Sequence, residues 1–308
     1  MYGASHDPPV GARRRGKNCL GRGAAIAIAA AATLVLATEI AVAPPLGFDE
    51  AVYALGGRSL VGVERSYYPD YRPAGMRAVA ALGVLAGGKD WQLRIVPAAL
   101  ALAFGAAAIR LARRWHGAAA ARLVAACLLA WPQLVERGAQ LLSDLPAALA
   151  GLVALGELIA ATERDEPHPL RRAALAGTAA AASFWLRYGA VVAIAATGAA
   201  VLVARPRRWR LLAVFAAIVV AAIAPWLWYS EHQTGSLAGI ALDAQHAAGN
   251  PHVGAGLATY ASGWFVTIAG PVVGVVALIG IYAAARRRST PWAIAALAAV
   301  VQLIGLGL

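Results

Sequence analysis

The sequence has little charge for its length. Only 14% of its 308 residues are charged, whereas a soluble domain has about a quarter, and 60% are hydrophobic, with a mean hydropathy of +0.64. The apolar residues also come in blocks rather than singly. This composition excludes an ordinary soluble domain and indicates an integral membrane protein, whose apolar segments face lipid.

Cysteine and metal-ligand patterns are also scarce. Of the two cysteines, Cys19 precedes the first apolar block and Cys127 lies inside a later one, so no disulfide framework is expected. His232, His246 and His252 share one loop, but their spacings of 14 and 6 residues match no zinc-ligand pattern. No metal site is predicted.

The charge that is present has one dominant sign. There are 27 lysines and arginines but 15 acidic residues, which gives a net charge of +12. A basic patch can indicate nucleic-acid binding, yet these residues cluster in short runs between apolar blocks, as in the cytoplasmic loops of membrane proteins. The runs lie at 13–15, 113–114, 171–172, 205–210 and 286–288. Nucleic acid is therefore not an expected partner.

Nine apolar segments are predicted to span the membrane. They are 24–43, 94–112, 118–133, 145–161, 172–186, 188–204, 211–229, 264–284 and 292–308. Several are shorter than the roughly 20 residues of a straight span. Many are rich in alanine and glycine, which let helices approach closely in lipid. The expected fold is an all-α, polytopic helical bundle in the membrane.

The first 23 residues are basic and contain proline and glycine, so we expect a disordered cytoplasmic tail before a membrane domain of residues 24–308. A secretory signal peptide is the alternative, because residues 41–43, Ala-Val-Ala, resemble a cleavage site. The apolar run is long for a signal peptide and many spans follow it. We therefore favour an uncleaved first span.

The charges also predict a topology. With the N-terminus inside and the C-terminus outside, nineteen lysines and arginines fall on the cytoplasmic side and eight on the external side, as the positive-inside rule requires. Acidic residues show the opposite bias. Those assigned to the external side are Asp49, Glu50, Glu64, Asp70, Asp90, Glu136, Asp144, Glu231 and Asp243.

The first external loop, about 44–91, is long and carries two predicted helices. Residues 48–60 form the first, and residues 73–87, opened by Pro73, form the second. The second is too short to span comfortably and is expected to lie along the membrane interface. Long loops with their own helices are often functional.

Six short motifs follow one another in and after this loop. They are Phe-Asp-Glu-Ala-Val-Tyr at 48–53, Tyr-Arg-Pro at 71–73, Trp-Gln-Leu-Arg-Ile-Val-Pro at 91–97, Ala-Arg-Arg-Trp-His-Gly at 112–117, Leu-Leu-Ser-Asp-Leu-Pro at 141–146 and Trp-Leu-Arg-Tyr at 185–188. Their order, spacing and predicted side of the membrane resemble the GT-C glycosyltransferases of the protein O-mannosyltransferase and lipid A aminoarabinose transferase type (glycosyltransferase family 39-like). The resemblance covers about 24–288 and is strongest over 44–146.

The sequence departs from that family at three positions. Arg72 stands where the family usually has lysine or histidine, and Pro73-Ala74 replaces a pair of prolines. The family's arginine about five residues before the Ser/Thr-Asp motif is replaced by Ala139, with Arg137 nearby.

The resemblance implies a GT-C membrane glycosyltransferase of the inverting type. It would transfer a sugar from a polyprenyl-phosphate donor to an acceptor on the external face of the cell membrane. Membrane lipid is the other expected partner, and the acceptor is a glycan, a lipid or a protein. GT-C enzymes differ in metal dependence, so no cofactor is assigned and a divalent cation stays an open option.

Such a reaction needs a base for the acceptor hydroxyl and cations for the leaving phosphate. The resemblance places the catalytic carboxylate at Asp49, with Glu50 and Asp144 as groups that orient the acceptor or hold a cation. Guanidinium groups bind phosphate through two N–H donors. The candidates for the donor phosphate are Arg72, Arg94, Arg137 and Arg187, and the further pocket residues are Tyr53 and Tyr71.

Other interpretations stay open at this level. The carboxylates of residues 49 and 50 also suit a helix N-terminus, Asp144 suits a helix start, and single arginines often contact lipid headgroups. The whole chain could be an inactive GT-C scaffold that binds lipid-linked sugar, or a small-solute transporter, although no internal repeat of the transporter kind is evident. Convergence of Asp49 and Asp144 on one external cavity with arginines nearby would favour the enzyme.

Overall fold

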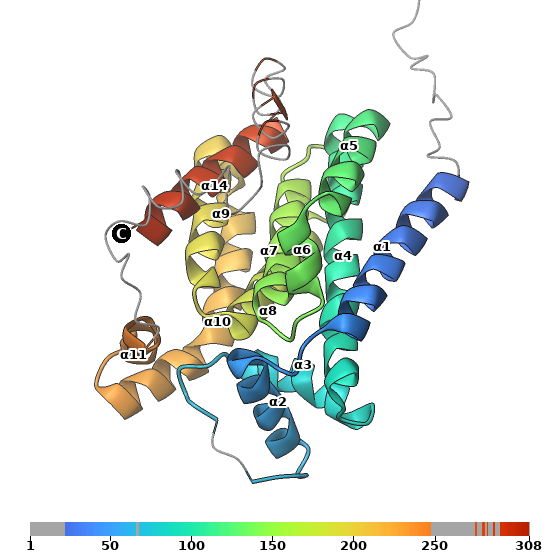
Figure 1. Cartoon of the computed structure of the whole chain (residues 1–308). Helices are drawn as coiled ribbons and strands as arrows, with labels where there is room; N and C mark the ends of the chain where they lie inside the picture. The colour runs from blue at the N-terminus through green and yellow to red at the C-terminus, as the bar shows by residue number, and fades with distance from the viewer. Residues whose placement is uncertain are drawn as a thin grey trace, which may run out of the picture.

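The computed structural model describes residues 22–65, 68–247 and 290–307, with five isolated positions between the last two ranges. Every regular element in these ranges is a helix, as the sequence predicts (Figure 1). The helices are α1 (Arg22–Val42), α2 (Phe48–Leu60), α3 (Ala74–Leu85), α4 (Asp90–His116), α5 (Ala118–Leu129), α6 (Pro132–Gly138), α7 (Asp144–Ala161), α8 (Pro169–Leu186), α9 (Ala190–Ala204), the short 3-10 helix η1 (Pro206–Arg208), α10 (Trp209–Thr234), α11 (Gly239–Ala247) and α14 (Thr290–Gly307).

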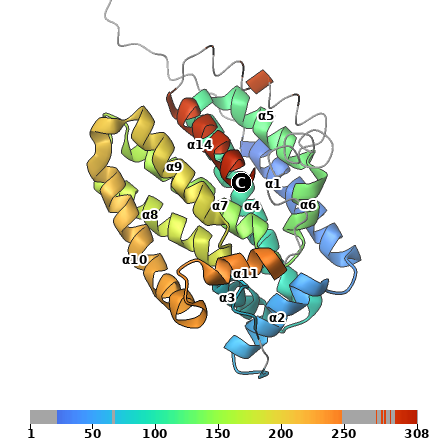
Figure 2. The ribbon, with the colours of Figure 1, turned by 90° about the vertical axis from the view of Figure 1, so that its left-hand side faces the viewer.

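The centre of the bundle is formed by α4, α7, α8, α9 and α10, and α14 packs against α9 (Figures 1 and 2). The largest buried cluster joins α7 to α10 with α14 and contains six alanines: Ala154, Ala176, Ala180, Ala196, Ala200 and Ala298. Glycines bring helices closer still. A Cβ on Gly177 of α8 would lie 2.9 Å from the Phe215 carbonyl oxygen of α10. Small residues therefore set the helix separations, as expected in lipid.

The helices correspond to the predicted spans with one clear difference. The predicted span 118–133 is split, because α5 ends at Leu129 and α6 begins with Pro132 at its first position. Proline has no N–H to donate and clashes with the preceding turn, which favours it in the first turn of a helix. Residues 1–21 and His252 are not described, and of the segment 264–284 only four positions are described.

Three described helical segments are long and apolar enough to cross a membrane: Asp90–His116, Asp144–Ala161 and Pro206–Thr234. Four shorter apolar segments accompany them: Ile26–Val42, Ala74–Leu85, Ala118–Leu129 and Ala190–Ala204. The total of nine spans stays a prediction.

The loop after α1 folds into α2 and α3, which lie together at one end of the bundle (Figure 1). The bounds of α2 are those predicted, and α3 starts after Pro73, which takes the N-cap position. The two helices touch closely: a Cβ on Gly57 would lie 2.7 Å from the backbone of α3. The Tyr68 hydroxyl donates to the Pro73 carbonyl at 2.9 Å. This end of the bundle carries the candidate site.

Candidate active site

Glu50 lies beneath the loop with its carboxylate fully engaged. Arg94 donates from Nε to Oε1 at 3.0 Å and from Nη2 to Oε2 at 2.9 Å. The backbone N–H groups of Leu141 and Gly47 donate to the same carboxylate at 2.9 and 3.0 Å. Burial raises the pKa of Glu50, but the hydrogen bonds from Arg94 and from the two backbone groups outweigh it and hold the pKa below its ordinary value.

Arg94 is equally enclosed. Its side chain is 3% exposed, that of Glu50 is 7% exposed, and its Nη1 donates to the Pro44 carbonyl at 2.9 Å. All three nitrogens of the predicted phosphate ligand thus have protein partners. The Glu50–Arg94 pair ties α2 to the start of α4 and, through Leu141, to the segment before α7.

The neighbouring carboxylate, Asp49, is in a different environment. Arg72 Nη2 donates to its Oδ1 at 2.6 Å, and the side chain of Asp49 remains 48% exposed. We call this contact the α2 ion pair. Residues 49 and 72, which the sequence analysis placed in catalysis and phosphate binding, are therefore brought together across the loop.

Arg72 lies near the rings of two tyrosines. Its guanidinium carbon is 5.8 Å from the ring centroid of Tyr53 and 5.5 Å from that of Tyr71, within cation–π range. Burial lowers the pKa of Arg72. The hydrogen bond to Asp49 and the charge of Asp49 raise it by a larger amount, so the pKa lies above its ordinary value. The Nε of Arg72 is buried and has no hydrogen-bond partner in the described part of the chain. Arg72 is thus a charged donor with one unused N–H.

A second aspartate–arginine contact joins α7 to the α8–α9 turn. Arg187 Nη1 donates to Oδ1 of Asp144, the first residue of α7. We call this contact the α7 ion pair. Both side chains line a cavity of about 520 Å³ between α7, α8, α9 and α14, whose other lining is mostly alanine, leucine, isoleucine and phenylalanine.

Tyr188 connects the two ion pairs and was not among the predicted site residues. Its hydroxyl donates to the Arg72 backbone carbonyl at 3.2 Å. Its ring packs against Phe184 and Trp226, with centroids 5.2 and 4.8 Å apart. The available signal was its place next to Arg187 in the 185–188 motif, but nothing local reveals a partner 116 residues away.

The two ion pairs are connected on two sides. On one side, Tyr188 bonds the arginine of the α2 ion pair and is the chain neighbour of the arginine of the α7 ion pair. On the other side, Leu141 bonds Glu50, the neighbour of Asp49, and lies three residues before the aspartate of the α7 ion pair. The two ion pairs are thus linked twice, once through Tyr188 and once through Leu141, at one end of the bundle.

Two limits of this convergence are visible. Asp49 does not line the cavity at the α7 ion pair, so the pairs share an end of the bundle rather than one cavity. Arg137 is exposed in the last turn of α6, and no side-chain partner for it is found among the described residues. Within the same residues there is no group of three or more histidine, cysteine, aspartate or glutamate side chains that could hold a metal ion.

Known proteins resemble this chain in sequence and in fold. The family described as dolichyl-phosphate-mannose-protein mannosyltransferase matches residues 72–229. ArnT from Cupriavidus metallidurans bound to undecaprenyl phosphate superposes with a TM-score of 0.73 at 18% identity, covering 93% of this chain and 56% of ArnT. The apo state of ArnT gives 0.66 at 17% identity, with coverages of 93% and 55%. No curated protein sequence matches.

These similarities agree with the architecture. The structural match shows the GT-C fold of an integral membrane protein, and the chain spans about half the length of the ArnT structures. The family match contains Arg72, Arg94, Asp144 and Arg187 and begins after Asp49. Since it covers half of the chain, the protein belongs to the dolichyl-phosphate-mannose-protein mannosyltransferase family of GT-C membrane proteins.

Proposed function

We propose that this protein is an inverting glycosyltransferase that moves a sugar from a polyprenyl-phosphate donor to an acceptor at the external face of the membrane. Family membership supports sugar transfer, and the undecaprenyl phosphate bound to ArnT supports a lipid-phosphate donor. The distribution of basic residues supports an external site, because the candidate site lies on the side with few lysines and arginines.

The observation that carries the proposal is the α2 ion pair. Asp49 is half exposed, and the hydrogen bond found in the described residues uses only its Oδ1. Its Oδ2 can therefore accept the proton of an acceptor hydroxyl. Arg72 bonds Asp49 through Nη2, while its Nε is unused. The Arg72 side chain is 20% exposed, so a phosphate oxygen would approach its accessible part beside the ion pair.

These groups suit the bonds that must change. The acceptor oxygen forms a bond to the anomeric carbon as the bond from that carbon to the phosphate oxygen breaks. The bonding electrons leave with the phosphate, where Arg72 stabilises the charge, and the acceptor proton passes to Asp49. Attack from the side opposite the phosphate inverts the configuration.

The surroundings of the α7 ion pair suit the polyprenyl chain of the donor. Arg187 lies at a mostly apolar cavity, so a phosphate near its guanidinium would leave the apolar polyprenyl chain next to apolar side chains. The rings of Tyr53 and Tyr71 both lie within cation–π range of the Arg72 guanidinium. We assign Glu50 and Arg94 a different role: because their polar atoms are already paired, they position the start of α2 and hence Asp49.

The test is transfer from a panel of radiolabelled polyprenyl-phosphate sugars by the purified protein in nanodiscs. We expect Asp49→Asn to lower kcat by roughly 100- to 10,000-fold, the usual contribution of a general base. The matched control is Asp90→Asn, because Asp90 also begins a helix at the end of this loop but lies outside the ion pairs.

The outcomes separate the parts of the proposal. Equal transfer by wild type and Asp49→Asn would reject Asp49 as the base while keeping the enzyme. No transfer by folded wild-type protein with any donor would favour the inactive scaffold. An equal loss in Asp90→Asn would show that the effect is not specific to Asp49.

A further inference from the structure

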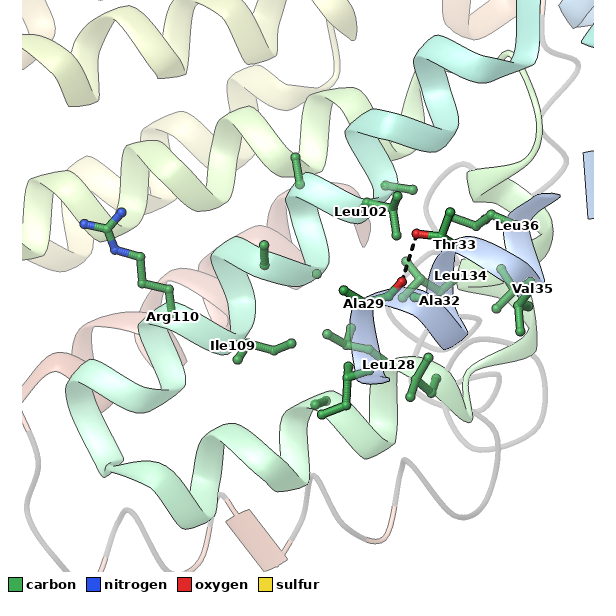
Figure 3. A pocket seen from close by; sticks show the side chains of 18 of the residues that line it. Ala29, Ala32, Thr33, Val35, Leu36, Leu102, Ile109, Arg110, Leu128 and Leu134 are labelled. Carbon is green, nitrogen blue, oxygen red and sulfur yellow. Dashed lines mark hydrogen bonds between the residues drawn. The ribbon is translucent and has the colours of Figure 1, made fainter. Parts of the chain in front are cut away.

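A second pocket lies between α1, α4, α5 and α6 and is lined by neither ion pair (Figure 3). Its volume is about 690 Å³, within the range of roughly 300–1,000 Å³ of pockets that hold small molecules. Apolar side chains from all four helices line it, among them Ile28, Leu36, Leu102, Leu128 and Leu134. An apolar chain would find hydrocarbon on most sides of this pocket.

The charged groups of this pocket are confined to one end. The Thr33 hydroxyl, halfway along α1, donates to the Ala29 carbonyl at 2.8 Å and is thereby satisfied within its own helix. The charged lining residues are Arg110 and Arg113, one turn apart on α4. Figure 3 shows Arg110 at the end of the α4 segment away from Leu102, with its guanidinium directed away from the apolar side chains. The pocket is thus apolar along its length and cationic at one end.

The position of these arginines along α4 sets their depth in the membrane. Arg110 lies twenty residues after Asp90, which is about 30 Å along a helix at 1.5 Å per residue. That length matches a hydrocarbon core of roughly 30 Å. With Asp90 at the interface near α2 and α3, we expect Arg110 at the other interface, where lipid phosphates are found.

We propose that this pocket binds an anionic glycerophospholipid of the leaflet opposite the candidate active site. Its acyl chains lie between α1 and α4, and its phosphate lies against Arg110 and Arg113. Basic pockets between membrane helices bind anionic headgroups in this way. The site is separate from the donor site, because Arg110 lies sixteen residues, about 24 Å along α4, after Arg94, which bonds the chain neighbour of Asp49.

The charge complementarity is testable on the full chain. The purified, delipidated protein in detergent is titrated with phosphatidylglycerol and with phosphatidylcholine of the same acyl chains, and bound lipid is counted by native mass spectrometry. We expect phosphatidylglycerol to bind more tightly. Arg110→Gln should weaken it by about fivefold, the effect of one basic residue at an anionic surface, and should leave phosphatidylcholine unchanged.

Two further variants complete the experiment. Arg122→Gln is the matched control, because Arg122 is an exposed arginine of the neighbouring helix α5 that does not line the pocket. Ala106→Phe fills the pocket from α4 and should weaken both lipids. The proposal is overturned if Arg110→Gln keeps the full preference for phosphatidylglycerol, if Arg122→Gln loses as much as Arg110→Gln, or if Ala106→Phe binds both lipids like the wild type.

Discussion

Replacing Glu50 by glutamine should damage the fold far more than replacing its neighbour Asp49 by asparagine. In Glu50→Gln the Arg94 guanidinium stays buried at 3% exposure without a counter-ion. Breaking a buried ion pair by removing one partner costs about 3–5 kcal/mol. The NH₂ group of the new glutamine would also face the backbone N–H of Leu141 or Gly47, so two donors would meet where a carboxylate oxygen now accepts. We therefore expect a loss of stability of about 5 kcal/mol, the upper end of this range.

Asp49→Asn breaks a contact that is 48% exposed on the aspartate side. An exposed ion pair contributes about 0–1 kcal/mol, because water screens it and solvates the freed groups. The two adjacent carboxylates should therefore differ by several kcal/mol in their effect on stability, while the variant at position 49 should have the larger effect on transfer if Asp49 is the proposed base.

The assay is reversible unfolding of the purified protein in mixed micelles, followed by tryptophan fluorescence and far-UV circular dichroism. A double variant, Glu50→Gln with Arg94→Met, removes the buried charge as well and should recover part of the loss. The reasoning is refuted if Glu50→Gln unfolds within about 1 kcal/mol of wild type, or if the double variant is as unstable as the two single losses added together.

Three other expectations follow from described contacts. Gly57→Ala should lower the free energy of unfolding by about 1–3 kcal/mol, because its Cβ would lie 2.7 Å from the α3 backbone. The control is Gly189→Ala, whose Cβ would have no atom within 4 Å. It should leave the melting temperature unchanged in the same thermal-unfolding measurement. Tyr188→Phe removes the hydrogen bond that positions Arg72, so steady-state kinetics should show a donor KM raised roughly two- to tenfold with a smaller change in kcat. The folded-state pKa of Glu50 lies below its ordinary value of 4.5, so its contribution to stability is complete above pH 4.5 and is lost as the pH falls through the lower folded-state pKa; acid-unfolding curves should lose this component in Glu50→Gln.

Much of the fold follows from local sequence. The blocks of alanine, leucine and valine give helices because a chain in lipid must satisfy its own backbone hydrogen bonds. The helix 48–60 was predicted with its observed bounds. The break at Pro132 had a signal in the sequence, because proline favours the first turn of a helix, but the predicted span 118–133 ended one residue after this proline instead of before it.

The sequence by itself determined that this protein is a helical membrane protein, which family it resembles, and which loop collects acidic and basic side chains. Only the tertiary structure decided how those side chains are paired. Glu50 and Asp49 are adjacent and chemically alike, yet one is enclosed by Arg94 and two backbone N–H groups and the other is half exposed beside Arg72. The reason is physical: helix formation depends on near neighbours along the chain, whereas burial and ion pairing depend on residues 23, 44 and 91 positions away that only packing brings together.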